Sequence, residues 1–237
     1  MTKNVNLHDT RNGEDLTIVI PAKNEAATIV EIVQRCQRHS PHILVLDGQS
    51  TDGTGEKAIA AGARVISVTR NGKGCAIREA VHHLTTPFVV FIDADGSHVA
   101  EDIPRLVAPL REGHADHVQA SRLIGGSSEF HGSLSAFFRL TGGAFITTCI
   151  NWRFGTCLSE SQNGFRALTT ELLRRLDLRE SITTIEQEMV IKTLHHGARL
   201  VDVPSHEHRR RFGDSKIRLW RVAFRYVYSM IKYLIFK

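Results

Sequence analysis

The chain has 237 residues, 42% of them hydrophobic and 23% charged, which fits one large globular domain and excludes a disordered or fibrous protein. Its net charge of +5 is placed unevenly: residues 205–237 carry nine Lys and Arg against two acids, whereas the remainder carries 21 against 23. Four cysteines without C-x-x-C spacing predict reduced thiols in a cytosolic setting, and residues 1–15 are too polar for a signal peptide.

Strand-like and helix-like patterns alternate along the first half of the chain. The predicted strands are Leu16–Ala22, His42–Leu46, Arg64–Val68, Phe88–Ile92 and His117–Ala120. The predicted helices are Glu25–His39, Thr51–Ala61, Lys73–Leu84 and Asp102–Leu110. Repeated strand–helix units of this length predict an α/β fold, with a largely parallel sheet flanked by helices on both faces.

After Arg122 the pattern changes, because residues 123–161 are rich in Gly, Ser and aromatic side chains. An apolar stretch over Leu134–Ile150 is interrupted by Arg139 and by two glycines, which makes it a poor membrane span. We expect a mobile loop and a helix over the active face, with an ordinary core helix as an equal alternative. The predicted elements beyond it are a strand at Asn163–Leu168, a helix at Ile185–His195 and a strand at Leu200–Val203.

A last helix is predicted to begin near Ser215, and it divides the chain into a main domain at residues 1–214 and a C-terminal amphipathic helix at 215–237. Its polar residues recur every three or four positions and form one stripe: Arg218, Arg221, Arg225, Ser229 and Lys232. The opposite side is aromatic and aliphatic. A basic stripe beside such a face is typical of a helix that lies in a membrane interface, and the alternative is a helix docked on the domain.

Charged clusters follow four of the predicted strands directly, and ligands of parallel sheets bind where the strands end. The most informative cluster is the acidic pair Asp93 and Asp95 after a buried strand. In extended chain these carboxylates point the same way. They suit Mg²⁺ or Mn²⁺, which also bridges the oxygens of a diphosphate, so the pair predicts a site for a nucleotide-diphosphate donor. Taken by itself, the pair also fits an Asp-Gly turn.

Six motifs in this order and spacing resemble family 2 glycosyltransferases of the GT-A fold, and more narrowly the dolichol-phosphate mannosyltransferase group. The motifs are Val19–Glu25, Val45–Thr54, Asn71–Gly74, Asp93–Asp95, Gln162–Arg166 and Arg210–Lys216. The resemblance covers roughly residues 16–122 and 160–220. It implies a Rossmann-like, mostly parallel sheet and the transfer of a hexose from GDP-mannose or UDP-glucose to a polyprenyl or dolichyl phosphate.

The resemblance also assigns the residues of the donor site. Those that would bind the nucleotide sugar are Pro21, Asn24, Glu25, Asp47, Lys73, Asp93, Ala94, Asp95, Gln162 and Arg166. Asp47 can accept a hydrogen bond from a ring N–H of either uracil or guanine. Asp93 and Asp95 would hold the metal. Many family members have Gln as a further ligand two residues later, where this chain has Ser97, whose hydroxyl could bind directly or through water.

Three cations match phosphate-facing positions of the family, namely Arg122, Arg210 and Lys216. Such cations offset the repulsion between donor diphosphate and acceptor phosphate, and with the acidic pair they form the predicted catalytic set. Gln162 and Arg166 are expected to position the sugar or the acceptor, with a structural role as the alternative. Lys73 is expected near phosphate, although its motif also fits a turn before a helix.

A phosphate acceptor is ionised near neutral pH, so the expected mechanism is one inverting displacement without a general base. The alternative acceptor is a sugar hydroxyl, which needs a carboxylate base. Glu186 or Glu188 could supply it, but they lie about 200° apart on a helix, so only one could face the site. Their other interpretation is surface charge.

The expected partners are the nucleotide sugar, the lipid phosphate and a membrane surface. We therefore expect a cytoplasmic protein, peripheral on the cytoplasmic face of a membrane, held there by the last helix or by a membrane-anchoring partner. A non-enzymatic alternative is a module that binds membranes or nucleic acid through the basic tail. It leaves the acidic pair unexplained, and the sequence has no aromatic-rich RNA-binding motif, so nucleic acid is not expected as a partner.

Overall fold

The computed structural model of the chain describes residues 13–128, 134–210 and 219–236. In these residues the strands are β1 (Leu16–Ala22), β2 (His42–Asp47), β3 (Arg64–Ser67), β4 (Phe88–Phe91), β5 (His117–Ser121), β6 (Arg166–Thr169) and β7 (Leu200–Pro204). The helices are α1 (Ile29–Gln37), α2 (Thr54–Ala60), α3 (Lys73–Val81), α4 (Ile103–Arg111), α5 (Arg122–Gly125), α6 (Leu134–Phe154), α7 (Thr170–Arg175), α8 (Ile185–His195) and α9 (Leu219–Ile235). A 3₁₀ turn, Ala100–Asp102, precedes α4.

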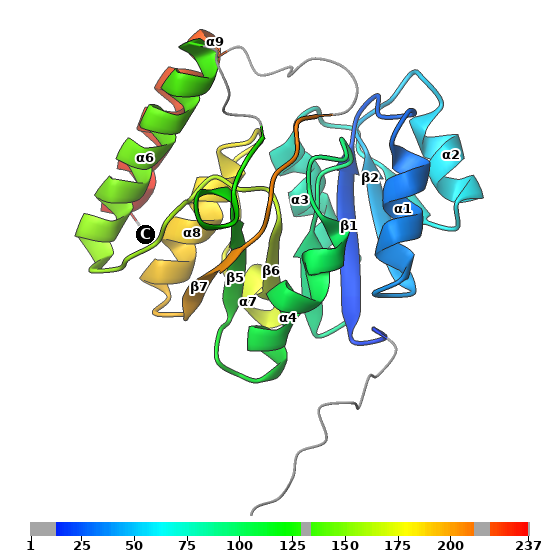
Figure 1. Cartoon of the computed structure of the whole chain (residues 1–237), viewed down its shortest axis with the longest axis horizontal. Coiled ribbons are helices and arrows are strands. Elements are labelled where there is room, and N and C mark those ends of the chain that lie inside the picture. The colour runs from blue at the N-terminus through cyan, green and yellow to red at the C-terminus, as the bar shows by residue number, and fades with distance from the viewer. Residues whose placement is uncertain (1–12, 129–133, 211–218, 237) are drawn as a thin grey trace, which may run out of the picture.

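The strands form one sheet in the order β3-β2-β1-β4-β6-β5-β7. β6 runs antiparallel to both of its neighbours, and the other pairings are parallel. The predicted α/β fold with a mostly parallel sheet is therefore confirmed (Figure 1). The residues of β1 and β2 are almost all buried, as expected of central strands covered on both faces.

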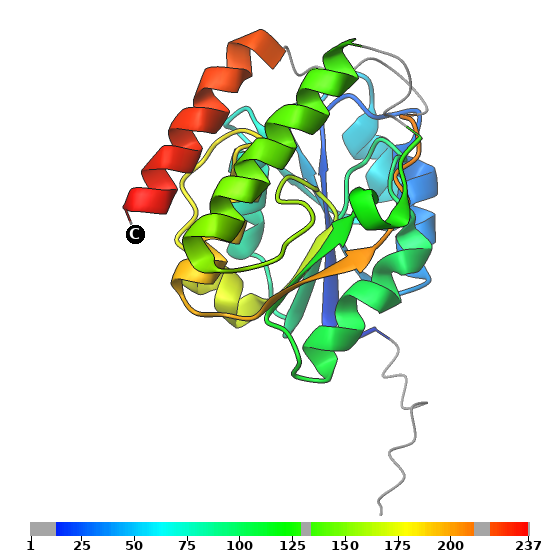
Figure 2. The ribbon, with the colours of Figure 1, turned by 60° about the vertical axis from the view of Figure 1, so that its left-hand side comes forward.

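Helices cover both faces of the sheet and a third layer adds to one side. On one face α1 packs through Ile29, Ile32, Val33 and Cys36, which recur at helical spacing, beside α2 and α4. On the other face α3, α7 and α8 pack together. α6 and α9 lie side by side over the outer side of α8 (Figure 2). In Figure 1 this third layer lies on the left of the molecule, beyond α8 and β7.

The last helix is docked in an orientation that the sequence analysis did not predict. Ser229, placed on the polar stripe, is only 1% exposed and packs inward together with Tyr233. Phe224, Tyr228 and Ile231 face outward, so the face that α9 turns toward the domain includes Ser229 of the polar stripe. The cause is polar anchoring: two carbonyls of α9 accept hydrogen bonds from side chains of α8. The predicted start near Ser215, together with Arg218, lies outside the described residues.

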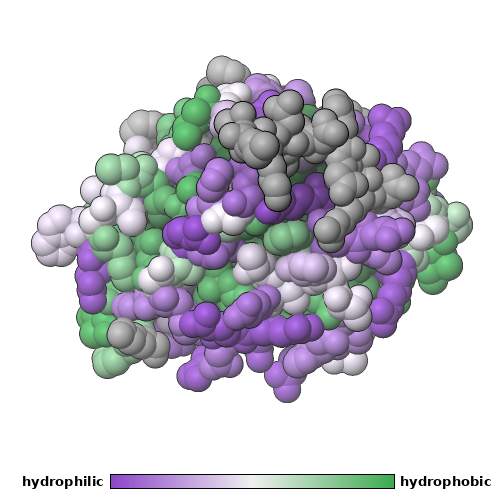
Figure 3. All heavy atoms as spheres, turned by 90° about the horizontal axis from the view of Figure 1, so that it is seen from below, coloured by the Kyte–Doolittle hydropathy of each residue, from purple (hydrophilic) through white to green (hydrophobic). Residues whose placement is uncertain are grey.

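No helix within the described ranges is both long and apolar enough to cross a membrane. The sheet positions the candidate site, because β1, β2 and β4 all end at the upper edge in Figure 1. The face seen from below carries hydrophilic side chains interspersed with smaller hydrophobic areas (Figure 3).

Candidate active site

The loops that follow β1 and β2 are tied together at the carboxyl edge of the sheet. The side chain of Asn24 accepts from the amide of Thr51 at 2.9 Å, and the amide of Asn24 donates to the hydroxyl of Ser50 at 2.9 Å. Ser50 in turn donates to Oδ1 of Asp47 at 2.5 Å. Asp47 and Asn24 thus lie at neighbouring strand ends, as predicted, and Asn24 contributes by joining the loops. Pro21 is half-buried within β1.

The acidic pair follows β4, which ends at Phe91, two residues before Asp93. Asp95 lies in a turn rather than in extended chain, so the expectation of strand-like alternation is wrong here. The reason is local: Oδ1 of Asp95 accepts from both the amide of Ser97 (3.0 Å) and its hydroxyl (2.7 Å), which closes the turn. Ser97 is buried and orients Asp95 by this contact.

Ala94, between the two aspartates, anchors the same turn to the rest of the domain, and its side chain is buried. Its carbonyl accepts from the hydroxyl of Thr28, at the start of α1, at 2.6 Å. The contact of Ala94 that the structure shows is therefore with the side chain of Thr28. Oδ2 of Asp95 is left to face Arg210.

Arg210 links the acidic turn to the loop after β1. Its Nε lies 3.5 Å from Oδ2 of Asp95, and its Nη2 donates to Oε1 of Glu25. The segment before Arg210 is held in place by Glu207, which forms isolated bridges with His98 and Ser127. The structure therefore brings together three residues that the sequence analysis assigned to one site. Lys216, assigned to the same cationic set, lies outside the described residues.

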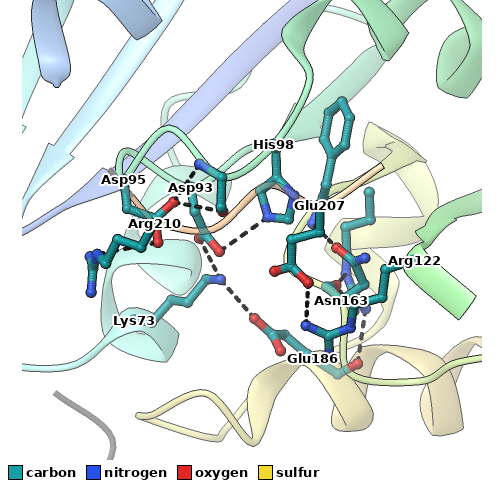
Figure 4. Close-up of polar contacts among 12 residues, drawn as sticks. Lys73, Asp93, Asp95, His98, Arg122, Asn163, Glu186, Glu207 and Arg210 are labelled. Carbon is teal, nitrogen blue, oxygen red and sulfur yellow. Dashed lines mark hydrogen bonds and ion pairs between the residues drawn. The ribbon is translucent and has the colours of Figure 1, made fainter. Parts of the chain in front are cut away.

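Asp93, which is half-buried, is the centre of a charge network (Figure 4). Its Oδ1 lies 2.5 Å from Nζ of Lys73, and its Oδ2 lies 3.4 Å from Nε2 of His98. Lys73 also contacts Oε1 of Glu186 at 2.7 Å. Burial opposes the charge of Asp93, but Lys73 and His98 outweigh it and hold the pKa of Asp93 well below its ordinary value. Burial alone would lower the pKa of His98, yet Asp93 raises it.

Arg122 occupies a second cluster a short distance away. Its Nη1 lies 2.6 Å from Oε2 of Glu207, and its Nη2 lies 2.6 Å from Oε1 of Glu160. Burial raises the pKa of Glu160 even though Arg122 counteracts it. The predicted phosphate-facing cation is thus held between two carboxylates at the site edge, close to the network of Asp93 (Figure 4).

Arg166 has a different place from the one that the donor-binding expectation implied. It is 1% exposed, and its guanidinium donates to the carbonyls of Asn163 and, at 2.9 Å, of Glu186. A side chain enclosed in this way has no surface to offer a ligand, which favours the structural alternative. Gln162 is half-buried and donates to Oε1 of Gln187 at 3.4 Å. Its role stays a prediction.

The two glutamates of α8 point to different sides of the helix, as the helix geometry predicted. Glu186 faces the site through Lys73, whereas Glu188 accepts from the amides of Arg179 and Glu180 at 2.8 Å on another side. The alternative of surface charge is wrong for both, because both are buried. Sequence reasoning missed His98, Glu160 and Glu207. Glu160 and Glu207 pair with Arg122, which is distant in sequence. His98 lies only five residues after Asp93, but no motif spacing marks it.

The residues present fit a divalent cation. Asp93 and Asp95 offer hard carboxylate oxygens two residues apart at the end of β4, and such oxygens are the ligands that Mg²⁺ and Mn²⁺ prefer. Among the described residues, no group of three or more His, Cys, Asp or Glu side chains is arranged to hold a metal. Such a site fits Mg²⁺ or Mn²⁺ that takes one or two carboxylates and completes its shell with substrate phosphates and water.

Comparison with known proteins agrees with this geometry. The sequence model of glycosyl transferase family 2 matches residues 17–176. Glycosyltransferase AglJ of Haloferax volcanii is 33% identical over 199 residues, and the chain spans only 64% of the length of AglJ. The undecaprenyl-phosphate mannosyltransferase of Micrococcus luteus is 29% identical over 214 residues, which cover 84% of this chain and 86% of that protein.

Among solved structures, glucosyl-3-phosphoglycerate synthase from Mycobacterium tuberculosis, in complex with Mg²⁺ and UDP, superposes with a TM-score of 0.78. The sequence identity is 23%, and the match covers 94% of this chain and 80% of that one, so it establishes the fold. The architecture is the GT-A-like α/β fold expected from the sequence. The chain belongs to glycosyl transferase family 2.

Proposed function

We propose that the protein is an inverting hexosyltransferase that moves a sugar from a nucleotide-diphosphate sugar to a polyprenyl phosphate. GDP-mannose and UDP-glucose are the donors that the family resemblance favours. The name of the Micrococcus luteus relative, an undecaprenyl-phosphate mannosyltransferase, supports a lipid phosphate as acceptor. The site adds a chemical argument that does not depend on any relative.

The observation that carries this proposal is the pairing of the acids around the Asp93–Asp95 turn. Six carboxylates lie there, and each has a basic partner within the described residues: Glu25, Asp93, Asp95, Glu160, Glu186 and Glu207. A carboxylate held by a cation is a weak general base. The site therefore suits an acceptor that arrives ionised, and a phosphate monoester does so, with a second pKa of about 6.

In the proposed reaction a phosphate oxygen of the acceptor attacks the anomeric carbon of the sugar in line with the leaving group. The bond from that carbon to the diphosphate oxygen breaks, its electron pair stays with the departing nucleoside diphosphate, and the configuration inverts. We propose that Arg122 and Arg210, which ion pairs hold at this edge, neutralise the two phosphate groups, with Lys216 as a third cation. Catalysis is then positioning and charge stabilisation.

Asp93 and Asp95 would hold the metal, Mg²⁺ or Mn²⁺. When bound, the metal supplies positive charge that stabilises the leaving diphosphate. Glu25, Asn24 and Asp47 lie at the ends of β1 and β2, where a nucleoside next to this diphosphate would reach them. Nucleotide-sugar binding by these residues is part of the proposal.

The third layer supports a membrane location. α9 turns Phe224 outward with 76% of its surface exposed, and α6 does the same with Trp152 at 87%. Moving a prenyl chain out of a bilayer costs about 0.8 kcal/mol per CH₂ group, so the enzyme must reach its acceptor at the membrane. We propose that residues 215–237 lie at the cytoplasmic surface of a membrane beside the main domain, residues 1–214. A membrane-anchoring partner is the other route.

A second candidate is a glycosyltransferase with a hydroxyl acceptor. The observation in its favour is Glu186, a carboxylate that faces the same edge and could take a proton if Lys73 released it. This candidate predicts transfer to a sugar or to a small hydroxy acid.

One assay separates the candidates: a C10–C20 polyprenyl phosphate, a free sugar and 3-phosphoglycerate are offered side by side with GDP-mannose, UDP-glucose or UDP-N-acetylglucosamine. The proposal expects a labelled lipid product with Mg²⁺ or Mn²⁺ and none with EDTA. Asp95→Asn should remove transfer, whereas the matched control Asp177→Asn, an exposed surface acid, should retain it. Product only from a hydroxyl acceptor would establish the second candidate.

A further inference from the structure

The loop that carries Lys73 is fixed by main-chain packing rather than left open. A Cβ added at Gly72 would overlap the carbonyl oxygen of Ser181, and one added at Gly74 would overlap the backbone of Glu180. The amide of Cys75 donates to the carbonyl of Ser181 at 3.3 Å. Gly72 and Gly74 are therefore required because two backbone segments approach closely here. This packing fixes the position of Lys73 at the start of α3.

Lys73 reaches from this fixed loop into the charge network. Its Nζ lies 2.5 Å from Asp93 and 2.7 Å from Glu186, and its side chain is 16% exposed. Gly164 closes the arrangement from the loop that precedes β6. A Cβ there would lie 2.6 Å from Oδ2 of Asp93 and would overlap Nζ of Lys73. A side chain at position 164 would therefore push the ion pair apart.

We propose that Lys73 is a positioning residue that acts through Asp93 and Glu186, and that Gly164 is a glycine because it must leave room for this ion pair. The inference rests on the proposed function in one respect, namely that Asp93 helps to hold the metal. It replaces the expectation that Lys73 contacts a donor phosphate. In this arrangement the ammonium holds the half-buried carboxylate of Asp93 and the buried carboxylate of Glu186 at a fixed separation.

The physical consequence of losing Lys73 is a clash of charge. Asp93 and Glu186 would then face each other in a largely enclosed space without the ammonium between them, and like charges there repel. Asp93 would turn away from the position in which it can bind a metal. If Glu186 also lost its charge, the repulsion would vanish and Asp93 could return, still held by His98.

A double-variant cycle tests this coupling. The affinity for Mn²⁺ at saturating UDP, and separately at saturating GDP, is measured from the electron paramagnetic resonance signal of free Mn²⁺. We expect Lys73→Met to weaken Mn²⁺ binding by at least tenfold, Glu186→Gln by less than threefold, and the combined variant to recover to within threefold of the wild type. A direct contact between Lys73 and phosphate predicts instead that the combined variant is as weak as Lys73→Met, which would overturn the inference.

A second variant leaves Lys73 in place. Gly164→Ala should weaken Mn²⁺ binding by at least tenfold, whereas the matched control Gly142→Ala, on the exposed side of α6 with nothing within 4 Å of the added Cβ, should stay within twofold. Wild-type binding by Gly164→Ala would contradict the inference.

The unfolding temperature is recorded for each variant. A fold lost in Lys73→Met and regained in the combined variant also supports the coupling. Because metal binding is measured directly, two failures can be told apart. If the wild type binds Mn²⁺ and the effects of the two substitutions simply add, only the role of Lys73 is refuted. If the wild type binds no Mn²⁺, the proposed metal-dependent function is refuted.

Discussion

Arg210 and Asp95 form a contact that joins two distant parts of the chain, with Nε of the arginine 3.5 Å from Oδ2 of the aspartate. The same guanidinium donates to Glu25, so it spans the loop after β1 and the turn after β4. A donor diphosphate bound to a metal at the turn would enter the space between these loops. Arg210 would then exchange carboxylate partners for phosphate oxygens, which it binds equally well.

Loss of this arginine tests that exchange. Arg210→Ala should lower kcat by roughly 10²–10³-fold, since one preorganised cation at the leaving group is removed, and Arg210→Lys should restore part of it. The matched control is Arg209→Ala, because Arg209 is exposed and next in sequence. Steady-state kinetics with a soluble short-chain acceptor measures both. Equal, small effects of the two alanine variants would argue against a role in the reaction.

The outward apolar residues of α9 make a prediction about membranes. The double variant Phe224→Ser with Ile231→Ser should lose binding to anionic phospholipid vesicles in a sedimentation assay, because both side chains are exposed on the proposed membrane side. The control is Ile59→Ser on α2, which is 61% exposed on the far side of the sheet. Transfer to a short-chain acceptor in solution should persist in all variants. Undiminished vesicle binding by the double variant would refute the proposed surface.

The interior position of Arg166 predicts a stability effect. Arg166→Met should lower the free energy of unfolding by about 2–4 kcal/mol, because the buried carbonyls of Asn163 and Glu186 lose their donors. Arg175→Met, at an exposed site on α7, should change it by less than about 0.5 kcal/mol. Urea unfolding measures both. If Arg166→Met kept its stability but lost nucleotide binding, the ligand-positioning expectation would be right instead.

His117 gives a pH dependence with a definite sign. Burial, and then the charge of Arg166, hold the pKa of His117 well below 6.5. His117 therefore stays neutral in the folded state at a pH at which it is protonated in the unfolded state. The contribution of neutral His117 to the free energy of unfolding is therefore complete above pH 6.5. Below that pH the free energy of unfolding decreases by up to about 1.4 kcal/mol per pH unit. His117→Gln should flatten the stability curve between pH 5 and 6.5, as measured by urea unfolding.

The control for this pH effect is His42→Gln, an exposed histidine at the start of β2. It should leave the slope of stability against pH as it is in the wild type. A slope in His117→Gln equal to that of the wild type would show that another group is responsible.

The sequence was sufficient for the alternation of strands and helices, because buried central strands and amphipathic helices carry distinct apolar periods. It did not reveal that β6 is antiparallel or that Thr170–Arg175 forms α7, since a four-residue strand has no signature of direction and a six-residue helix shows less than two turns of period. The predicted strand from Asn163 begins only at Arg166, because Asn163 to Phe165 form the loop beside Lys73.

In the site, the residues within motifs were found, including the partners Arg210, Asp95 and Glu25, whereas the partners outside the motifs, His98, Glu160 and Glu207, were not. Asp93 and Lys73 stand in short motifs, so their positions at strand ends were predictable. The contacts of Asp93 with His98 and of Arg122 with Glu160 depend on loop conformations that close over the sheet edge. The burial of Ser229 could not be predicted either. Helical periodicity shows which residues share a face of a helix, but it does not show which element that face packs against.

The central claim is that Asp93 and Asp95 grip a cation that binds the donor diphosphate. The most direct measurement is anomalous diffraction at the manganese edge from crystals grown with Mn²⁺ and a nucleoside diphosphate. We predict one strong peak within about 2.0–2.3 Å of a carboxylate oxygen of this pair, with phosphate oxygens completing the shell. A nucleotide bound elsewhere, with no peak at Asp93 or Asp95, would contradict the account.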